Sequence, residues 1–292
     1  AEWLDREIVL IYPSGFQANL AAVLALSDRH TPVICDRLIH HSLLVGVKAS
    51  GAKLIRFTHN IFSELERLLK KSRQSNSQKQ PLVITESLFS MEGTTAPIKE
   101  ISKLCIKYDS KLLIDEAHAF GVMGSAGRGE SFGLKEPISI ISGTFGKAFG
   151  SGGAFLATDK ITGKNLIQNC GAFRYTTALA PPLCASALAA LNLIESNPNW
   201  GSELKEKSKA LRDRLSQVGW QRPAGEGPII TIIRGSARIA MDYQKRLEGQ
   251  GLLTVAIRPP TVPEGKSRLR LVIRRNTPDQ AFERLIEILK NK

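Results

Sequence analysis

The sequence predicts an α/β fold with a mostly parallel central sheet in a large domain and a smaller C-terminal α+β domain. The chain has 292 residues, of which 42% are hydrophobic, enough for a large core and a satellite core. Short apolar runs without polar alternation are separated by helical patterns, which is typical of buried parallel strands. After residues 197–201 (NPNWG) this pattern is interrupted, so we place the domains at residues 1–198 and 199–292.

The predicted elements follow from local patterns along the chain. In the first domain an apolar helix is expected over 20–26, an amphipathic helix over 98–108 and a helix over 183–194. Residues 70–80 are polar and weakly patterned, which predicts a surface loop. The expected strands of this domain are 81–86, 111–115 and 138–142. In the second domain we expect helices over 202–215, 237–250 and 278–289, with strands over 229–233 and 269–273.

Charge and composition exclude some classes of protein and leave others open. The formal net charge of +13 is compatible with a solvated basic surface, with attraction of an anionic small molecule, or with nucleic-acid binding. Nucleic-acid binding is disfavoured because the basic stretches contain no interleaved aromatic residues. No apolar run reaches about 18 residues and no secretory signal pattern is present, so no membrane span is expected. Four cysteines without a CxxC pair fit a cytoplasmic protein.

Three polar residues follow predicted strands, where ligands of α/β sheets bind. Asp115 ends the strand 111–115, His118 comes three residues later, and Lys147 lies within the glycine-rich stretch 142–150. We expect Lys147 to be buried at a strand end. A buried lysine is costly when charged, and a Schiff base would neutralise it. These residues therefore predict carbonyl chemistry at this edge of the sheet.

A second signal lies near the N-terminus. The small-residue turn 14–19 (SGFQAN) precedes an apolar helix, and the N-terminus of a helix attracts phosphate through its free N–H groups and its dipole. Simple helix capping by Ser14 explains the same turn equally well.

Other motif matches fail in their context. Residues 115–118 (DEAH) copy a helicase box, but no phosphate-binding GxxxxGK[ST] loop exists in the sequence. Residues 129–133 (GESFG) match a hydrolase nucleophile elbow, yet no histidine follows His118 in the chain. The five histidines form no HExxH or Cys/His pattern, so no metal site is predicted.

Several motifs in the correct order together resemble a known family. These are 14–19 (SGFQAN), 36–40 (DRLIH), 86–93 (ESLFSMEG), 115–118 (DEAH), 121–124 (GVMG), 127–129 (GRG), 144–147 (TFGK) and 269–271 (LRL). They resemble the α-oxoamine synthases, which are fold-type-I enzymes dependent on pyridoxal 5′-phosphate (PLP). The resemblance extends over nearly the whole chain and implies a fold-type-I PLP-dependent transferase. Relative to typical members, about a quarter of the chain is expected to be absent at the N-terminus.

The resemblance assigns roles to residues by their position in these motifs. Lys147 is expected to carry the cofactor and then act as a base, with Asp115 paired to the pyridinium nitrogen. His118 and Ser90 are expected to contact the phenolic oxygen, and His40 to stack on the ring. Gly15, Phe16 and Thr144 are expected to bind the phosphate, together with Thr176 and Thr177 of a partner subunit, which implies a homodimer with shared active sites. Arg270 is expected to bind the amino-acid carboxylate, and Arg258 and Thr261 the other substrate.

Within the family, residues 256–263 (AIRPPTVP) and 268–270 (RLR) most resemble the branch that acts in biotin biosynthesis. This branch condenses L-alanine with a pimeloyl thioester and releases CO2 and the free thiol. Two alternatives remain. One is a sibling enzyme that uses glycine or serine, and the other is a catalytically inert subunit that only binds a partner.

Overall fold

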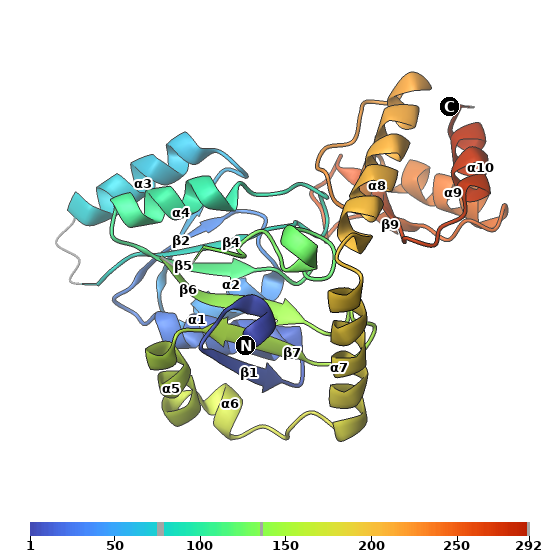
Figure 1. The fold of residues 1–292 in the computed structure, drawn as a ribbon. Helices are drawn as coiled ribbons and strands as arrows, with labels where there is room; N and C mark the ends of the chain where they lie inside the picture. Colours follow the sequence, from blue (N-terminus) through green and yellow to red (C-terminus); the bar gives the residue numbers. More distant parts are fainter. Residues whose placement is uncertain (75–78, 135–136, 291–292) are drawn as a thin grey trace. The chain divides into compact units, whose positions relative to one another are not determined.

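The computed structural model describes residues 1–74, 79–134 and 137–290 (Figure 1). The chain divides into two compact units. The first contains Ala1–Leu88 and Ala96–Pro198, and the second contains Phe89–Thr95 and Asn199–Lys292. The short segment Phe89–Thr95, which the sequence analysis placed in the first domain, thus belongs to the second unit by its contacts.

A mixed sheet forms the centre of the first unit. Among the described residues it has seven strands in the order β1-β7-β6-β5-β4-β2-β3. Neighbouring strands from β3 to β6 are parallel, whereas β7 is antiparallel to both β6 and β1. The strands are β1 (Ile8–Tyr12), β2 (Pro32–Asp36), β3 (Lys53–Phe57), β4 (Leu82–Glu86), β5 (Lys111–Asp115), β6 (Ile138–Thr144) and β7 (Ala154–Thr158). The prediction of a mostly parallel sheet in an α/β fold is therefore confirmed.

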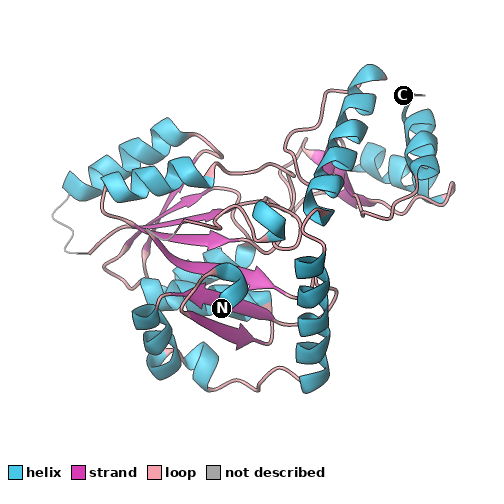
Figure 2. Cartoon of the chain, in the orientation of Figure 1, coloured by secondary structure: helices cyan, strands magenta, loops and turns pink. Residues whose placement is uncertain are grey.

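Helices cover both faces of this sheet (Figure 2). They are α1 (Gly15–Leu26), α2 (His41–Ser50), α3 (Phe62–Gln74), α4 (Ile98–Lys107), α5 (Lys160–Asn169), α6 (Gly171–Arg174) and α7 (Pro181–Ser196), with short 3-10 turns at Glu2–Leu4 and Ser125–Gly127. The loop predicted at 70–80 is wrong for 70–74, because α3 continues to Gln74. Leu65, Leu69 and Ser72 of α3 are buried on one side, and this spacing by three or four residues holds the polar segment in a helix. Residues 75–78 lie outside the described part of the chain.

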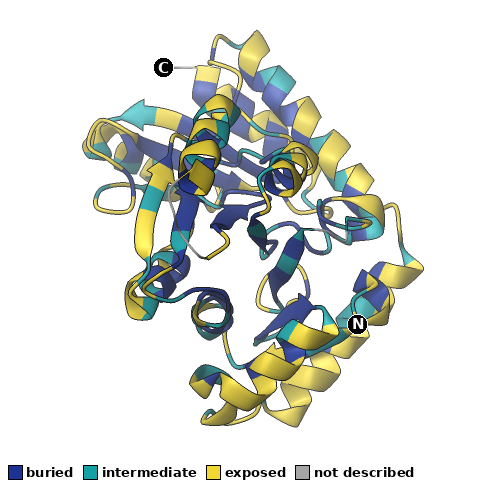
Figure 3. Cartoon of the chain, turned by 90° about the vertical axis from the view of Figure 1, so that its left-hand side faces the viewer, coloured by how far each residue is buried: buried dark blue, intermediate teal, exposed yellow. Residues whose placement is uncertain are grey.

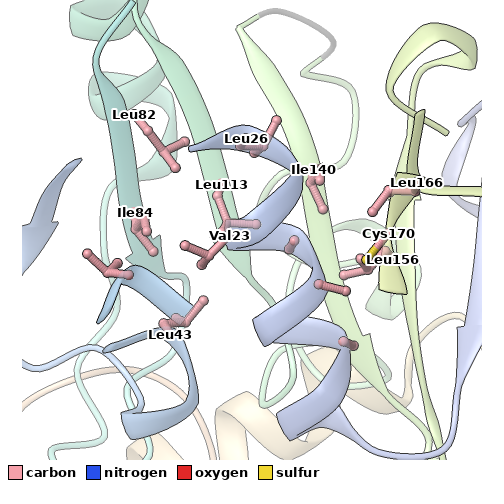
Figure 4. Packing of buried hydrophobic residues seen from close by; sticks show 14 of the residues in the cluster. Val23, Leu26, Leu43, Leu82, Ile84, Leu113, Ile140, Leu156, Leu166 and Cys170 are labelled. Atoms are coloured by element: carbon pink, nitrogen blue, oxygen red, sulfur yellow. The ribbon is translucent and has the colours of Figure 1, made fainter. Parts of the chain in front are cut away.

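The main core lies between one face of the sheet and the helices α1 and α2 (Figure 4). Val23 and Leu26 of α1 pack over Leu113 of β5 and Ile140 of β6, and all four are buried. Because side chains alternate along a strand, these residues face α1, whereas their neighbours in each strand face the other side. This packing fixes the N-terminus of α1 at the edge of the sheet where the parallel strands end.

The second unit has its own core beneath a small antiparallel sheet. In the described residues the strand order is β8-β10-β9, and three helices accompany the sheet. The elements are α8 (Trp200–Gln217), β8 (Ile229–Gly235), α9 (Ala237–Glu248), β9 (Val255–Ile257), β10 (Ser267–Val272) and α10 (Asp279–Lys290). Leu215, Leu247 and Leu269 are fully buried in this core.

Most of the strand residues are buried, whereas the outward faces of the helices are exposed, as is expected of a layered fold (Figure 3). Across the helices that the structure describes, none combines the length and the apolar character needed to cross a membrane.

Candidate active site

The carboxyl ends of the strands β1, β5 and β6 meet at one edge of the large sheet. Glu86 and Asp115, the last residues of β4 and β5, are register partners, and Asp115 also pairs with Ser142, two residues before the end of β6. Thr144 and Tyr12 both pair with Ala154 of β7, which brings the end of β1 to the same edge. Open α/β sheets bind ligands at this edge.

The Asp115 carboxylate is held at this edge by two hydrogen-bond donors. It is the last residue of β5 and only 5% exposed. Its Oδ1 accepts the Ala117 N–H at 2.9 Å, and its Oδ2 accepts Nδ2 of Asn19 at 2.7 Å. The carboxylate is thus fixed in orientation at a strand end.

His40 lies at the N-cap of α2, and its Nδ1 accepts the Ser42 N–H at 3.3 Å. Nδ1 also lies 2.7 Å from Oγ of Ser42. Desolvation lowers the pKa of His40 below its ordinary value. The Asp115 carboxylate opposes this shift, while the charges of Lys147 and His41 add to it. Asp115 and Lys147 therefore both lie within electrostatic reach of His40.

Asn19 and Ser42, which were not among the residues predicted from the sequence, connect Asp115 with His40. Nδ2 of Asn19 donates to both Asp115 Oδ2 at 2.7 Å and Ser42 Oγ at 3.0 Å. The available signal was a polar amide directly before the apolar run 20–26 of the same helix. Such a residue is usually buried only when it is hydrogen-bonded.

Glu116 is a second residue that the sequence analysis did not single out. It is fully buried, and its carboxylate accepts Ser87 Oγ at 2.5 Å, the Ser131 N–H at 2.7 Å and the Glu130 N–H at 3.2 Å. Desolvation raises the pKa of Glu116, and these hydrogen bonds oppose the shift. Glu116 thereby ties the glycine-rich segment that follows His118 to the end of β4, while His118 itself is half-buried in the turn after β5.

The predicted phosphate turn lies beside Thr144. Ser14 caps α1 by accepting the Gln17 N–H at 3.2 Å, as the capping interpretation requires. The N–H groups of Gly15 and Phe16 occupy the first turn, where intrahelical acceptors are lacking. A Cβ on Gly15 would lie 4.0 Å from Oγ1 of Thr144, so the hydroxyl lies close to the helix N-terminus. This hydroxyl donates to the Gly153 carbonyl at 3.0 Å and accepts the Gly146 N–H at 3.1 Å. Capping and anion binding are thus compatible in this turn.

Lys147 lies in a tight turn three residues beyond the end of β6. Its carbonyl accepts the Gly150 N–H at 3.0 Å, and the turn is closed by Phe145 N–H donating to Gly153 O at 2.9 Å. The Lys147 side chain is exposed, so the expectation that it is buried is wrong for this chain by itself. The short glycine-rich turn carries the side chain past the strand end instead of enclosing it within the sheet.

Thr176 and Thr177 lie between α6 and α7, with Thr176 half-buried and Thr177 exposed. Within the described ranges, no hydrogen bond connects either residue with Thr144 or Gly15. The chain alone therefore does not complete the predicted phosphate site with these residues.

The remaining predicted residues belong to the second unit. Arg270 is half-buried in β10, where its Nε donates to the Ser90 carbonyl at 2.7 Å, and burial lowers the pKa of its guanidinium. Arg258 and Thr261 are exposed at a turn closed by the Thr261 N–H donating to the Arg258 carbonyl at 3.1 Å. This unit thus brings Ser90 and Arg270 together.

Comparison with known proteins places the chain among characterised families. Residues 1–289 match the family model "Aminotransferase class I and II". The chain is 38% identical over 283 residues to 8-amino-7-oxononanoate synthase of Methylobacillus flagellatus, covering 96% of this chain and 70% of that protein. It is 36% identical to the enzyme of the same name from Trichlorobacter lovleyi, covering 99% of this chain and 74% of that protein.

Solved structures agree with this assignment. Serine palmitoyltransferase of Sphingomonas wittichii superimposes with a TM-score of 0.92 at 26% identity, over 99% of this chain and 73% of that one. 8-Amino-7-oxononanoate synthase of Francisella tularensis gives a TM-score of 0.86 at 27% identity, over 100% of this chain and 84% of that one. A structure of SPT with PLP also matches, at 25% identity and a TM-score of 0.92 over 99% of this chain and 73% of that one. The expected fold-type-I transferase fold is confirmed, and the chain belongs to the class I and II aminotransferase family, in the α-oxoamine synthase branch that contains the 8-amino-7-oxononanoate synthases.

Proposed function

We propose that the chain catalyses the PLP-dependent condensation of L-alanine with a pimeloyl thioester, giving 8-amino-7-oxononanoate, CO2 and the free thiol. The observation that carries this proposal is identity of 36–38% over nearly the whole chain to relatives named for this product. The polar cluster at the edge of the sheet supports it, since Asp115 and Lys147 both lie within electrostatic reach of His40.

The residues at this edge fit PLP. The N–H groups of Gly15 and Phe16 in the first turn of α1, with the Thr144 hydroxyl close by, would bind a phosphate group. The buried Asp115 carboxylate suits a protonated pyridine nitrogen. A bound PLP ring supplies an electron sink for the bond that is broken at the substrate Cα.

The chain's own groups supply proton transfer and orientation. Lys147 would hold the cofactor and then accept the proton from the substrate Cα. Asp115 would keep the pyridine nitrogen protonated, and His40 would stack on the ring. His118 and Ser90 would donate hydrogen bonds to the phenolic oxygen.

The second unit would bind the substrates. Arg270 is anchored through Nε to the Ser90 carbonyl, and both of its Nη groups can pair with an amino-acid carboxylate in bidentate fashion. Arg258 and Thr261 would contact the thioester. The net charge of +13 suits an acyl donor that carries phosphate groups, such as coenzyme A.

A homodimer would complete the phosphate site with Thr176 and Thr177 from the second subunit. The helix α7 that follows them is apolar on two sides. Ala187 and Ile194 are buried, whereas Leu188 and Leu193 on the opposite side are 59% and 56% exposed. An exposed apolar helix face of this kind is characteristic of a subunit interface, and a second copy also accounts for the two threonines.

The experiment is reconstitution with PLP followed by borohydride reduction and peptide mass spectrometry. We expect the cofactor on Lys147 and no label in Lys147→Ala, with Lys160→Ala as the matched control. Absorption spectra with L-alanine, glycine and L-serine, each followed by pimeloyl-coenzyme A, then test the substrates. Product with L-alanine alone supports the proposal, and absence of label on Lys147 rejects it.

A second candidate is a sibling enzyme that uses serine or glycine. The TM-score of 0.92 to serine palmitoyltransferase favours it, although the identity of 26% is lower than that to the synthases. A response to L-serine equal to that with L-alanine would favour this sibling. Absence of any bound PLP would instead favour the inert subunit.

A further inference from the structure

An unbroken chain of hydrogen bonds leads from Asp115 to His40. Asn19 Nδ2 lies 2.7 Å from Asp115 Oδ2 and 3.0 Å from Ser42 Oγ, and Ser42 Oγ lies 2.7 Å from His40 Nδ1. These hydrogen bonds, which we call the Asn19–Ser42 bridge, join α1, the first turn of α2 and the end of β5. It therefore connects two residues that the proposed function places on different parts of one cofactor ring.

The direction of each hydrogen bond follows from the chemistry of the groups. A carboxylate only accepts, so Asn19 must turn its NH2 group, and not its oxygen, toward Asp115. The same nitrogen donates to Ser42 Oγ, which lies 2.7 Å from His40 Nδ1 and can donate its hydroxyl proton to an unprotonated Nδ1. The Ser42 N–H points to the same ring nitrogen at 3.3 Å. Two donors on Nδ1 require that the ring proton resides on Nε2.

The Asn19–Ser42 bridge is buried, and burial fixes the positions of its side chains. Asn19 is 3% exposed and Ser42 is fully buried, as is almost all of Asp115. Breaking a hydrogen bond here leaves a buried polar group unpaired, and such groups are costly in a medium of low polarity. The charged groups that face His40 are Asp115, Lys147 and His41.

We propose that Asn19 and Ser42 are positioning residues that hold His40 as the neutral Nε2–H tautomer and fix the Asp115 carboxylate. The consequence for catalysis rests on the proposed PLP function: a neutral imidazole can stack on a cationic pyridinium ring without like-charge repulsion. The tautomer of His40 depends only on the protein and can be measured without PLP. The role of Asn19 and Ser42 can therefore be tested separately from PLP binding.

The test is nitrogen NMR of the chain labelled with ¹⁵N-histidine, first without PLP and then with it. His40→Gln identifies the His40 signals among those of the five histidines. Wild type is expected to show a protonated Nε2 and an unprotonated Nδ1 at neutral pH. In Ser42→Ala and Asn19→Ala the Nε2–H fraction should fall. Ser42→Thr should preserve it because its hydroxyl remains.

The matched control is Ser27→Ala, since Ser27 is also buried and donates to the Val23 carbonyl at 2.8 Å at the other end of α1. Ser42→Ala should raise the dissociation constant of PLP about tenfold, as loss of one buried hydrogen bond implies. Ser27→Ala should leave it unchanged. A wild-type His40 protonated on Nδ1, or identical His40 signals in Ser42→Ala and Ser27→Ala, overturns the inference. If the chain binds no PLP, the proposed function fails while the signals without PLP still decide the role of the bridge.

Discussion

Replacing Glu116 by alanine tests how the segment after His118 is held. In the wild type the buried carboxylate accepts three hydrogen bonds, from Ser87 Oγ, the Ser131 N–H and the Glu130 N–H. Each buried donor left unpaired costs about 1–3 kcal/mol, so the loss of all three should lower the free energy of unfolding by about 3 kcal/mol or more. Glu116→Gln keeps one acceptor oxygen and should cost about 1–2 kcal/mol.

The assay is hydrogen exchange read by mass spectrometry, because it reports on this segment within the first unit. In Glu116→Ala the amides of residues 130 and 131 should exchange about 100-fold faster, the factor that corresponds to roughly 3 kcal/mol. Glu100→Gln, on the exposed side of α4, is the matched control and should change nothing there. Unchanged exchange at residues 130 and 131 in Glu116→Ala would refute this account of Glu116.

The same residue predicts a pH dependence of stability. Burial raises the pKa of Glu116 above its ordinary value of 4.5, so the folded chain binds its proton more tightly than the unfolded chain does. The free energy of unfolding should therefore decrease as pH rises from 4.5 through the folded pKa, and then level off. Urea unfolding of wild type and Glu116→Gln across this range should show the decrease only in wild type. If the free energy of unfolding decreased equally in wild type and in Glu116→Gln, a titratable group other than Glu116 would cause the decrease.

Three further substitutions test the packing. Gly129→Ala should destabilise the first unit more than Gly133→Ala. Both glycines have positive φ angles, so both substitutions strain the backbone. Only at Gly129 would the new Cβ also collide, 2.8 Å from the Glu116 carboxyl carbon, because no described atom lies within 4 Å of a Cβ on Gly133. Equal losses in urea unfolding would show that backbone strain alone matters. Gly46→Ala places a Cβ 2.8 Å from Val23 Cβ and should cost about 1–3 kcal/mol, measured by the same unfolding. Adding Val23→Ala removes the two methyl carbons that would lie 3.1 and 3.4 Å from the new Cβ and should recover part of this cost. Strict additivity would show that these methyl groups do not contribute. Arg212 is fully buried and donates to the Gly227 and Ile229 carbonyls at 2.8 Å each. Arg212→Leu leaves these carbonyls unpaired and should lower the melting temperature of the second unit. Lys209→Ala, on the exposed side of α8, is the control and should not change it.

The sequence alone predicted the layered fold and the strands 81–86, 111–115 and 138–142, because continuous apolar runs are a local signature of buried strands. It also placed Asp115 at a strand end. The expected start of the first helix at residue 20 is wrong, because α1 begins at Gly15, directly after its cap Ser14, and residues 15–19 of the expected turn are helical. The helix continuing to Gln74 was missed because its apolar positions are few, and tertiary packing of Leu65 and Leu69 decides it.

The tertiary structure alone decided how these residues are connected. Asn19 and Asp115 are 96 residues apart in the chain, and Asn19 and Ser42 are 23 apart, so no local pattern reports their hydrogen bonds. Likewise the three donors of Glu116 come from Ser87, directly after β4, and from the glycine-rich segment, and only folding brings them to one carboxylate. The sequence determined which polar groups must be buried near the strand ends. The geometry of the fold determined which partners satisfy them, because a buried polar group takes the donor or acceptor that packing places within about 3 Å.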